Sequence, residues 1–499
     1  MTMKKNAGRT ALLSALFTVL LAPGAFAQEA LPIDLQTAIS KAFASHADIK
    51  KAEYSLDAAR ADYNAARESF GPKVALSQNT SRGGYWQEQQ ANGYSKQIGN
   101  SYSSGLNLTM PIYNGSLLAA EKRAKAAYQS SVLGEELAFI KLKQTTTDAY
   151  YKLLAAKDAQ EVCEQSVTML EDHLKNVQAQ YDVGVVAKVD LLRSEVELTS
   201  AQQNLIKAEN GYNIAEANLN NIMGIPQDTK LKLVEELGYE AYVGALPDCI
   251  DYAMLHRLDL QQSSLQVKAA EAALNGAKAG WAPSVTGSVS NNWTNGHWPG
   301  DDASRWGAGF NVSMNVFDSG VTKSNVAAAK ANLMEAKESY RQDTDAVQLD
   351  VRNCYFNLRE AEKRISTTQV AVAKAEEDYH IAQVRYEAGV GTNTDVLDAQ
   401  VALSEARNNF NTSLYDYNTS KAALQTAMGI EARPDDYRYM TYGDRYKATK
   451  ALYHAATEKT DSEKTLKETV KTLEKARAER KKATAAAAKE EKKLEKAKA

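Results

Sequence analysis

The chain has 499 residues and a net charge of −3, and its mean hydropathy is −0.45. Only nine residues are proline, and the 44% hydrophobic fraction comes mainly from alanine. This composition is typical of long helices with much solvent contact rather than of the several compact domains that the length alone suggests. An acidic chain body is not expected to bind nucleic acid.

The N-terminus has the layout of a signal peptide. Three basic residues within the first nine precede a short apolar run at 11–22, and small residues surround a cleavage point at 25–27. The run is shorter than the about 20 apolar residues that a membrane-spanning helix needs. We therefore expect residues 1–27 to be removed on export, and no later segment of the sequence predicts a transmembrane helix.

Cysteine and histidine residues show no spacing that indicates a catalytic or metal site. The three cysteines lie far apart, and the six histidines form no His-Glu-x-x-His motif. No nucleophile elbow or phosphate-binding glycine loop is present, and Gly389-Val390-Gly391 is better interpreted as a turn. The sequence predicts a protein that is not an enzyme and holds no metal or cofactor.

The chain contains an internal repeat. Residues 181–225 align without a gap on residues 386–430, and 16 of these 45 positions are identical. Such a repeat indicates that the two halves fold into the same order of elements. We predict a first structural repeat at 28–230, a second at 231–446 and a separate charged tail at 447–499.

Each half contains segments with the periodicity of β-strands. Apolar and polar residues alternate over 106–112 and over 310–316, and a partner strand is expected after Pro72 and after Pro283. Four strands of about ten residues are long enough to cross an outer membrane, but a closed barrel needs at least about eight. Long polar loops are predicted within the strand pairs, at 82–100 and 291–305.

All five tryptophans fall in or beside these strand pairs. Aromatic side chains gather at the two interfaces of a membrane, so this clustering favours an aromatic girdle. The alternative is a set of aromatic residues that pack or bind sugars in a soluble hairpin. The predicted membrane-interface residues are Trp86, Trp281, Trp293, Trp298 and Trp306.

A long stretch without proline follows each strand pair. These stretches run from Asn114 to Tyr181 and from Asp318 to Tyr386 and are rich in Ala, Lys, Glu and Gln. At about 1.5 Å per residue, each predicts a helix that spans about 100 Å.

A glycine turn ends each long helix, at Gly184 in the first half and at Gly389 and Gly391 in the second. Helices are expected to return from about 188 and 393, with apolar residues at every seventh position, which indicates a coiled coil rather than an ordinary amphipathic helix. The seam consists of Leu191, Leu198, Leu205, Tyr212 and Leu219 in the first half and of Val396, Leu403, Phe410, Tyr417 and Leu424 in the second.

This order of elements resembles the TolC family of outer-membrane efflux and secretion proteins. The shared features are the signal peptide, the twofold order of strand pair, long helix, Tyr-x-x-Gly turn and returning helix, and the stretch from Thr394 to Ala399; they cover about residues 31–446. The resemblance implies an α+β fold in which a homotrimer closes a 12-stranded β-barrel over a coiled-coil periplasmic tunnel. It also implies a location in the outer membrane of a Gram-negative bacterium, among outer-membrane lipids. The partners it implies are a periplasmic adaptor protein and an inner-membrane ABC or RND-type transporter, in an efflux pump or a type I secretion system.

The resemblance also implies where the tunnel closes. Asp395 and Asp398 match the paired aspartates that ring the family's periplasmic constriction, which gives six carboxylates in a trimer. Tyr386 and Asp190 match residues that link neighbouring helices in the closed state. For each acidic residue the alternative is a solvated charge at a helix start, which the helix dipole favours.

Two further positions concern this closing network. Gly391 stands where the best-studied family pattern has a basic residue. Arg193 is the first-half counterpart of Asp398, whereas Asp190 is the counterpart of Asp395. The two halves are therefore expected to differ in their roles at the constriction.

Two other functions remain open from the sequence. A passive porin would need more strands per chain and would have no use for helices of about 100 Å. A periplasmic structural or adaptor coiled coil would need no pore. The tail at 447–499, with 16 Lys and Arg against nine Asp and Glu, has no assigned function and is expected to form a solvated helix or no fixed structure.

Overall fold

The structure, a computed structural model, describes residues 30–89, 93–295 and 304–430, together with residues 471 and 475. The predicted signal peptide, Trp298 and, apart from those two residues, the predicted tail lie outside the described part.

Both halves of the chain run through a short strand, two helices, a strand pair, a long helix and a returning helix. The first half contains β1 (Leu31–Ile33), α1 (Leu35–Ser45), α2 (Ala47–Glu68), β2 (Lys73–Gln89), β3 (Gly93–Tyr113), α3 (Gly115–Asp182) and α4 (Lys188–Met223). The second half contains β4 (Leu231–Leu233), α5 (Leu246–His256), α6 (Leu258–Lys278), the 3-10 turn η1 (Ala279–Trp281), β5 (Ser284–Asn295), β6 (Ser304–Ser313), α7 (Val321–Glu387) and α8 (Asn393–Ala427).

The two long helices begin and end close to the predicted positions. Helix α3 has 68 residues and α7 has 67, so each is about 100 Å long. The side chain of Asn114 caps α3 by accepting hydrogen bonds from the N–H groups of Ser116 and Leu117, at 3.0 and 3.1 Å. Asp318 accepts from the N–H of Thr322 at 2.8 Å at the start of α7. These caps satisfy backbone donors that have no partner within the helix.

The strands form one antiparallel sheet in the order β2-β3-β5-β6, and β1 pairs with β4 in a separate parallel pair. The prediction of a loop at 82–100 is wrong, because the β2-β3 hairpin continues from the pair Arg82–Asn100 to the pair Gln89–Gly93. The loop predicted at 291–305 is too long, because β5 continues to Asn295 and β6 begins at Ser304. Backbone groups make the ladder hydrogen bonds, so polar side chains do not end a hairpin. Strand β6 ends at Ser313, before the predicted end at 316.

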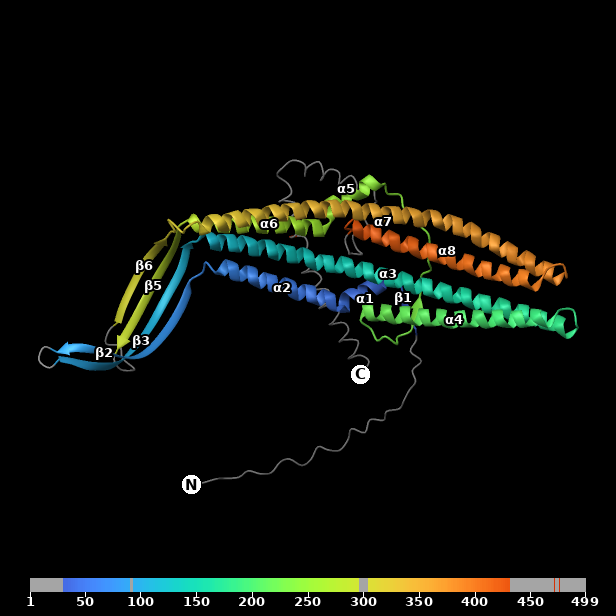
Figure 1. Ribbon diagram of the computed structural model, residues 1–499, viewed down its shortest axis with the longest axis horizontal. Helices are drawn as coiled ribbons and strands as arrows, with labels where there is room; N and C mark the ends of the chain where they lie inside the picture. Colours follow the sequence, from blue (N-terminus) through green and yellow to red (C-terminus); the bar gives the residue numbers. More distant parts are fainter. Residues whose placement is uncertain (1–29, 90–92, 296–303, 431–470, 472–474, 476–499) are drawn as a thin grey trace, which may run out of the picture.

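Helix α3 lies in the middle of a curved helical layer, with the sheet at one end and the helical turns at the other (Figure 1). Near the sheet, α3 packs between α2 and α6, and α7 packs on α6. Towards the turns, α3 packs between α4 and α8, and α7 packs on α8. The layer is therefore bounded by α2 and α4 on one side and by α7 on the other.

The apolar core follows the predicted seams. All ten seam side chains of α4 and α8 are buried or half-buried, and Leu219, Tyr417 and Leu424 are fully buried. The heptad prediction is confirmed at these positions. In the described part of the chain, no helix contains a segment apolar enough to cross a membrane.

Candidate functional site

One face of the four-stranded sheet is apolar and exposed. Val74, Leu108 and Val289 lie directly opposite one another on neighbouring strands, so their side chains share a face. The next positions along the strands, such as Asn107 and Ser290, place small and polar residues on the opposite face. The exposed apolar side chains are Val74, Leu76, Leu106, Leu108, Met110, Ile112, Val289, Phe310 and Val312. This alternation is typical of a sheet whose one face meets lipid.

Aromatic residues lie at both ends of strand β5. Trp281 immediately precedes the strand and is half-exposed, and Trp293 lies near its far end. Trp306, on the neighbouring strand β6, is 76% exposed. Trp86 belongs to β2, but its side chain lies outside the described part, as does all of Trp298. Trp281 therefore lies near one end of the sheet, whereas Trp293 and Trp306 lie near the other.

The turns at the far end of the hairpins depend on glycine. Gly184 and Gly389 follow the ends of α3 and α7 and have φ angles of 81° and 75°, a region that side chains with a Cβ rarely adopt. At Gly391 the reason is space, because an added Cβ would lie 3.0 Å from the backbone nitrogen of Tyr386 and 3.1 Å from the Cβ of Arg385. Any side chain at this position would therefore require the turn to shift by a few tenths of an ångström.

Asp395 and Asp398 are both exposed near the start of α8. Asp395 forms a capping box with Thr392, whose N–H donates to the carboxylate at 3.0 Å. Hydrogen bonds from the backbone and side chain of Thr392 lower the pKa of Asp395 within the chain. Among the described residues, Asp398 makes no hydrogen bond or ion pair, so its charge does not stabilise the turn through a direct contact.

The other residues predicted for the closing network, Tyr386, Asp190 and Arg193, lie between the two hairpins. The Tyr386 hydroxyl is buried and has no hydrogen-bond partner among the described residues. Burial, followed by the nearby charge of Asp190, raises its pKa. Arg193 on α4 donates to the hydroxyl of Thr394 on α8 at 2.6 Å. This contact joins one hairpin to the other.

The residue that the sequence reasoning missed is His173. Its Nε2 lies 2.6 Å from Oδ1 of Asn393, which is 220 residues further along the chain. The amide of Asn393 donates to the backbone oxygen of Asp190 at 3.0 Å and to the hydroxyl of Ser194 at 3.1 Å. The ring of His173 also packs 5.2 Å from that of Tyr386. No motif in the sequence marks this cluster, because four helices contribute to it.

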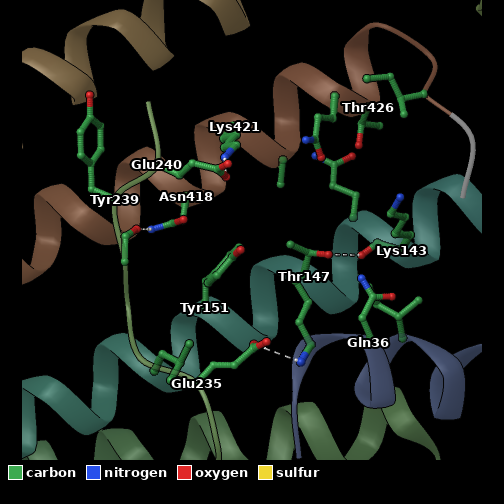
Figure 2. Close-up of a pocket in the computed structure, with 18 of the residues that line it drawn as sticks. Gln36, Lys143, Thr147, Tyr151, Glu235, Tyr239, Glu240, Asn418, Lys421 and Thr426 are labelled. Atoms are coloured by element: carbon green, nitrogen blue, oxygen red, sulfur yellow. Dashed lines mark hydrogen bonds and ion pairs between the residues drawn. The ribbon is translucent and has the colours of Figure 1, made fainter. Parts of the chain in front are cut away.

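A groove of about 660 Å³ lies between α1, α3, α8 and the segment 234–245 (Figure 2). This region, about midway between the sheet and the helical turns, is called the waist below (Figure 1). The segment 234–245 joins the two halves, because the side chain of Asn418 donates to Gly238 O at 3.0 Å and Lys421 pairs with Glu240 at 2.8 Å. At its other end, Glu235 accepts from the N–H of Leu35 at 3.3 Å. Acidic, basic and neutral side chains alternate around the groove, so it indicates no single class of ligand.

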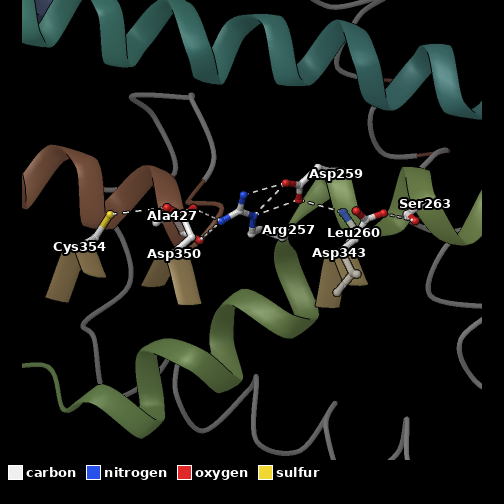
Figure 3. A network of polar contacts seen from close by, with 8 residues as sticks. All are labelled: Arg257, Asp259, Leu260, Ser263, Asp343, Asp350, Cys354 and Ala427. Atoms are coloured by element: carbon white, nitrogen blue, oxygen red, sulfur yellow. Dashed lines mark hydrogen bonds and ion pairs between the residues drawn. The ribbon is translucent and has the colours of Figure 1, made fainter. Parts of the chain in front are cut away.

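A second polar cluster at the waist fixes the junction of α5 and α6 to α7 and α8 (Figure 3). Arg257 pairs with Asp259 at 2.8 Å and with Asp350 at 2.5 Å, and it donates to the backbone oxygen of Ala427 at 3.1 Å. The guanidinium therefore joins three helices at one point, and it supports the end of α8 rather than forming a reactive centre.

A sheet with an exposed apolar face, joined to two helices of about 100 Å and two shorter returning helices, is the architecture expected of a long outer-membrane duct. Residues 38–225 and 249–430 match the family described as outer membrane efflux protein. The chain is 24% identical over 417 residues to outer membrane protein TolC of Escherichia coli (strain K12), with 79% of this chain and 82% of that protein covered. It is 23% identical over 409 residues to the probable efflux pump outer membrane protein TtgC of Pseudomonas putida, with the same coverage.

Solved structures show the same fold. The Campylobacter jejuni CmeC outer membrane channel superposes with a TM-score of 0.71 at 19% identity, covering 83% of this chain and 89% of that one. The outer membrane protein VceC of Vibrio cholerae gives 0.70 at 18% identity, covering 80% and 97%. The chain belongs to the outer membrane efflux protein family. It resides in the outer membrane and serves as an exit duct of efflux pumps.

Proposed function

We propose that three copies of this chain close one duct, with a 12-stranded barrel in the outer membrane and a helical tunnel in the periplasm. In this proposal the halves 28–230 and 231–446 each contribute one strand pair and one helical hairpin. The tunnel closes at the turns furthest from the sheet, and cargo that enters there leaves through the barrel.

The observation that carries the proposal is the pair of unpartnered edges of the helical layer. On α7, the large apolar side chains of Leu349, Phe356 and Val370 lie at multiples of seven residues and are 58 to 60% exposed. On α4, Ile206 and Ile214 are also exposed, and they lie between the levels of Val370 and Phe356 along the helical layer. Such stripes are typical of helices that pack on another helix, so the α7 edge of one copy suits the α4 edge of the next.

The sheet supports the same arrangement. Strands β2 and β6 lie at its two edges and have no further strand to pair with in the described chain. In a membrane their backbone groups need partners, since no water is present to satisfy them. Pairing β6 of one copy with β2 of the next gives a closed ring, and three copies supply 12 strands.

The turns at the far end are the proposed site of contact with a periplasmic adaptor protein, which connects the duct to an inner-membrane transporter. Val183, Val185 and Val390 are exposed there by 69 to 74%. Apolar side chains exposed together at one end of a molecule favour a protein partner. Asp395 and Asp398 of three copies are the proposed ring at the tunnel entrance, where they would attract cations.

The edge contact can be tested by substitution. We expect Phe356→Asp combined with Leu349→Asp to abolish the trimer, because two charges per interface would be buried without partners. Light scattering corrected for detergent should then show a mass near that of one chain. Val401→Asp is the matched control, because this exposed residue lies on α8, which is flanked by α3 and α7. A trimer that persists in the double variant would contradict the proposed edge.

A further inference from the structure

We propose that His173, Asn393 and Ser194 form an acid-sensitive latch that holds the two hairpins of each copy together at the closed tip. The inference rests on the proposed closure of the tunnel at the helical turns and adds a means of regulating it.

The three residues belong to helices that must separate if the tip opens between the hairpins. His173 lies on α3 and Ser194 on α4, whereas Asn393 begins α8. All three are at least 94% buried. A buried polar group that loses its hydrogen bond costs about 1–3 kcal/mol, so moving α8 away from α3 and α4 requires water to enter the cluster.

The backbone contact of Asn393 fixes the orientation of its side-chain amide. The backbone oxygen of Asp190 can only accept, so the group that contacts it is the NH₂ of Asn393, at 3.0 Å. The Oδ1 of Asn393 then faces Nε2 of His173 and accepts a hydrogen bond from its N–H group at 2.6 Å. The neutral imidazole with hydrogen on Nε2 therefore satisfies the contact, and a second proton is not needed to hold the latch.

The surroundings disfavour a charged imidazole. The titratable groups on the elements packed around it are Asp190 on α4, Tyr379 and Tyr386 on α7, and Tyr181 on α3 itself; α8 contributes the neutral Asn393. Burial lowers the pKa of His173 below its usual 6.5, and the hydrogen bond with Asn393 opposes this effect only in part. Asp190 contacts the latch through its backbone oxygen.

The sign of the pH effect follows from this difference. In the latched state the pKa of His173 lies below 6.5, whereas in an opened, wetted tip it returns to about 6.5. The latch is therefore at full strength above about pH 6.5 and weakens as the pH falls through that value. One His173 that gains a proton on opening changes the ratio of open to closed tips by at most about tenfold per pH unit. If the three copies in a trimer open together, the ratio changes by at most about a thousandfold per pH unit.

The test is the conductance of single channels in planar bilayers between pH 7.5 and 5, at constant salt. Wild-type conductance should rise as the pH falls. His173→Gln keeps an N–H donor for Asn393 but does not titrate, so it should lose this rise. His380→Gln is the matched control, because His380 is an exposed histidine on α7, and it should behave as wild type.

A second variant keeps His173 and changes its partner. Asn393→Asp places a carboxylate beside the imidazole and raises its pKa in the closed state, so acid should now favour the closed tip and reverse the trend. A wild-type conductance that does not change with pH, or a His173→Gln channel with the wild-type pH dependence, would overturn the latch. Absence of any channel in wild type would instead overturn the proposed duct, and the latch with it.

Discussion

At the scale of single residues, some residues at the α7-α8 turn are needed for the backbone conformation, and others contribute only charge. Gly391 is required by space and Asp395 by the capping box, whereas Asp398 is exposed without a local partner. These differences separate substitutions that disturb the turn from those that change only its charge.

Gly391→Ala should loosen the turn between α7 and α8. The added Cβ would contact the backbone at Tyr386, which cannot move as a flexible side chain would, and overpacking of this kind costs about 1–3 kcal/mol. Hydrogen exchange of a peptide spanning 384–396 should accelerate. Gly211→Ala is the control, because an added Cβ there meets open space in α4 and should stabilise the helix. Unchanged exchange in Gly391→Ala would show that the turn adapts.

Asp398→Asn should weaken block of the channel by multivalent cations without disturbing α8. The substitution removes three of the six proposed ring charges in a trimer and leaves the capping box of Asp395 intact. We expect the blocking concentration to rise at least about tenfold, and added salt to weaken block of the wild-type channel. Asp172→Asn, on the exposed face of α3, should leave block unchanged. Equal block in wild type and Asp398→Asn would place the constriction elsewhere.

At the scale of elements, the sheet and the helices distribute apolar residues in opposite ways. The helices bury their heptad seams within the chain, whereas the sheet exposes its apolar face. The sheet therefore depends on a lipid environment that the chain itself does not supply.

Phe310→Arg should impair assembly in the outer membrane. Phe310 is 79% exposed on the apolar face, and an arginine facing lipid near the bilayer centre costs about 2–4 kcal/mol. The amount of detergent-stable trimer in the outer-membrane fraction should fall. Asn311→Arg, at the next position and on the opposite face, should assemble normally. A similar loss of trimer in both variants would show that the two faces of the sheet are in the same environment.

At the scale of the whole molecule, the layer of helices has two unlike edges, so copies can associate head to tail and close a ring. The polar contacts at the waist are well placed to hold each copy in shape while the tips move. Arg257 joins α6 to α7 and α8, and the segment 234–245 joins α1 to α8.

Deletion of 447–499 should leave trimer formation and efflux intact. The family match ends at residue 430, and the segment contains few large apolar residues that could pack on the duct. The amount of detergent-stable trimer in the outer-membrane fraction and the single-channel conductance of the truncated chain, compared with full-length chain at equal abundance, would measure this. Loss of the trimer after deletion would assign the tail a role in assembly.

The sequence by itself determined the elements whose signals are local. The proline-free stretches and the heptad seams predicted the helices, because the period of apolar residues is a local signal. The polar hairpin of 82–100 was misread because backbone pairing does not depend on side-chain polarity. Tertiary structure alone revealed the cluster around His173 and the close contacts of Gly391. His173 becomes buried through Asn393, 220 residues away, and Gly391 is required by the backbone of Tyr386 folding back against it. Such contacts arise only when separate helices pack, so no residue spacing in the sequence predicts them.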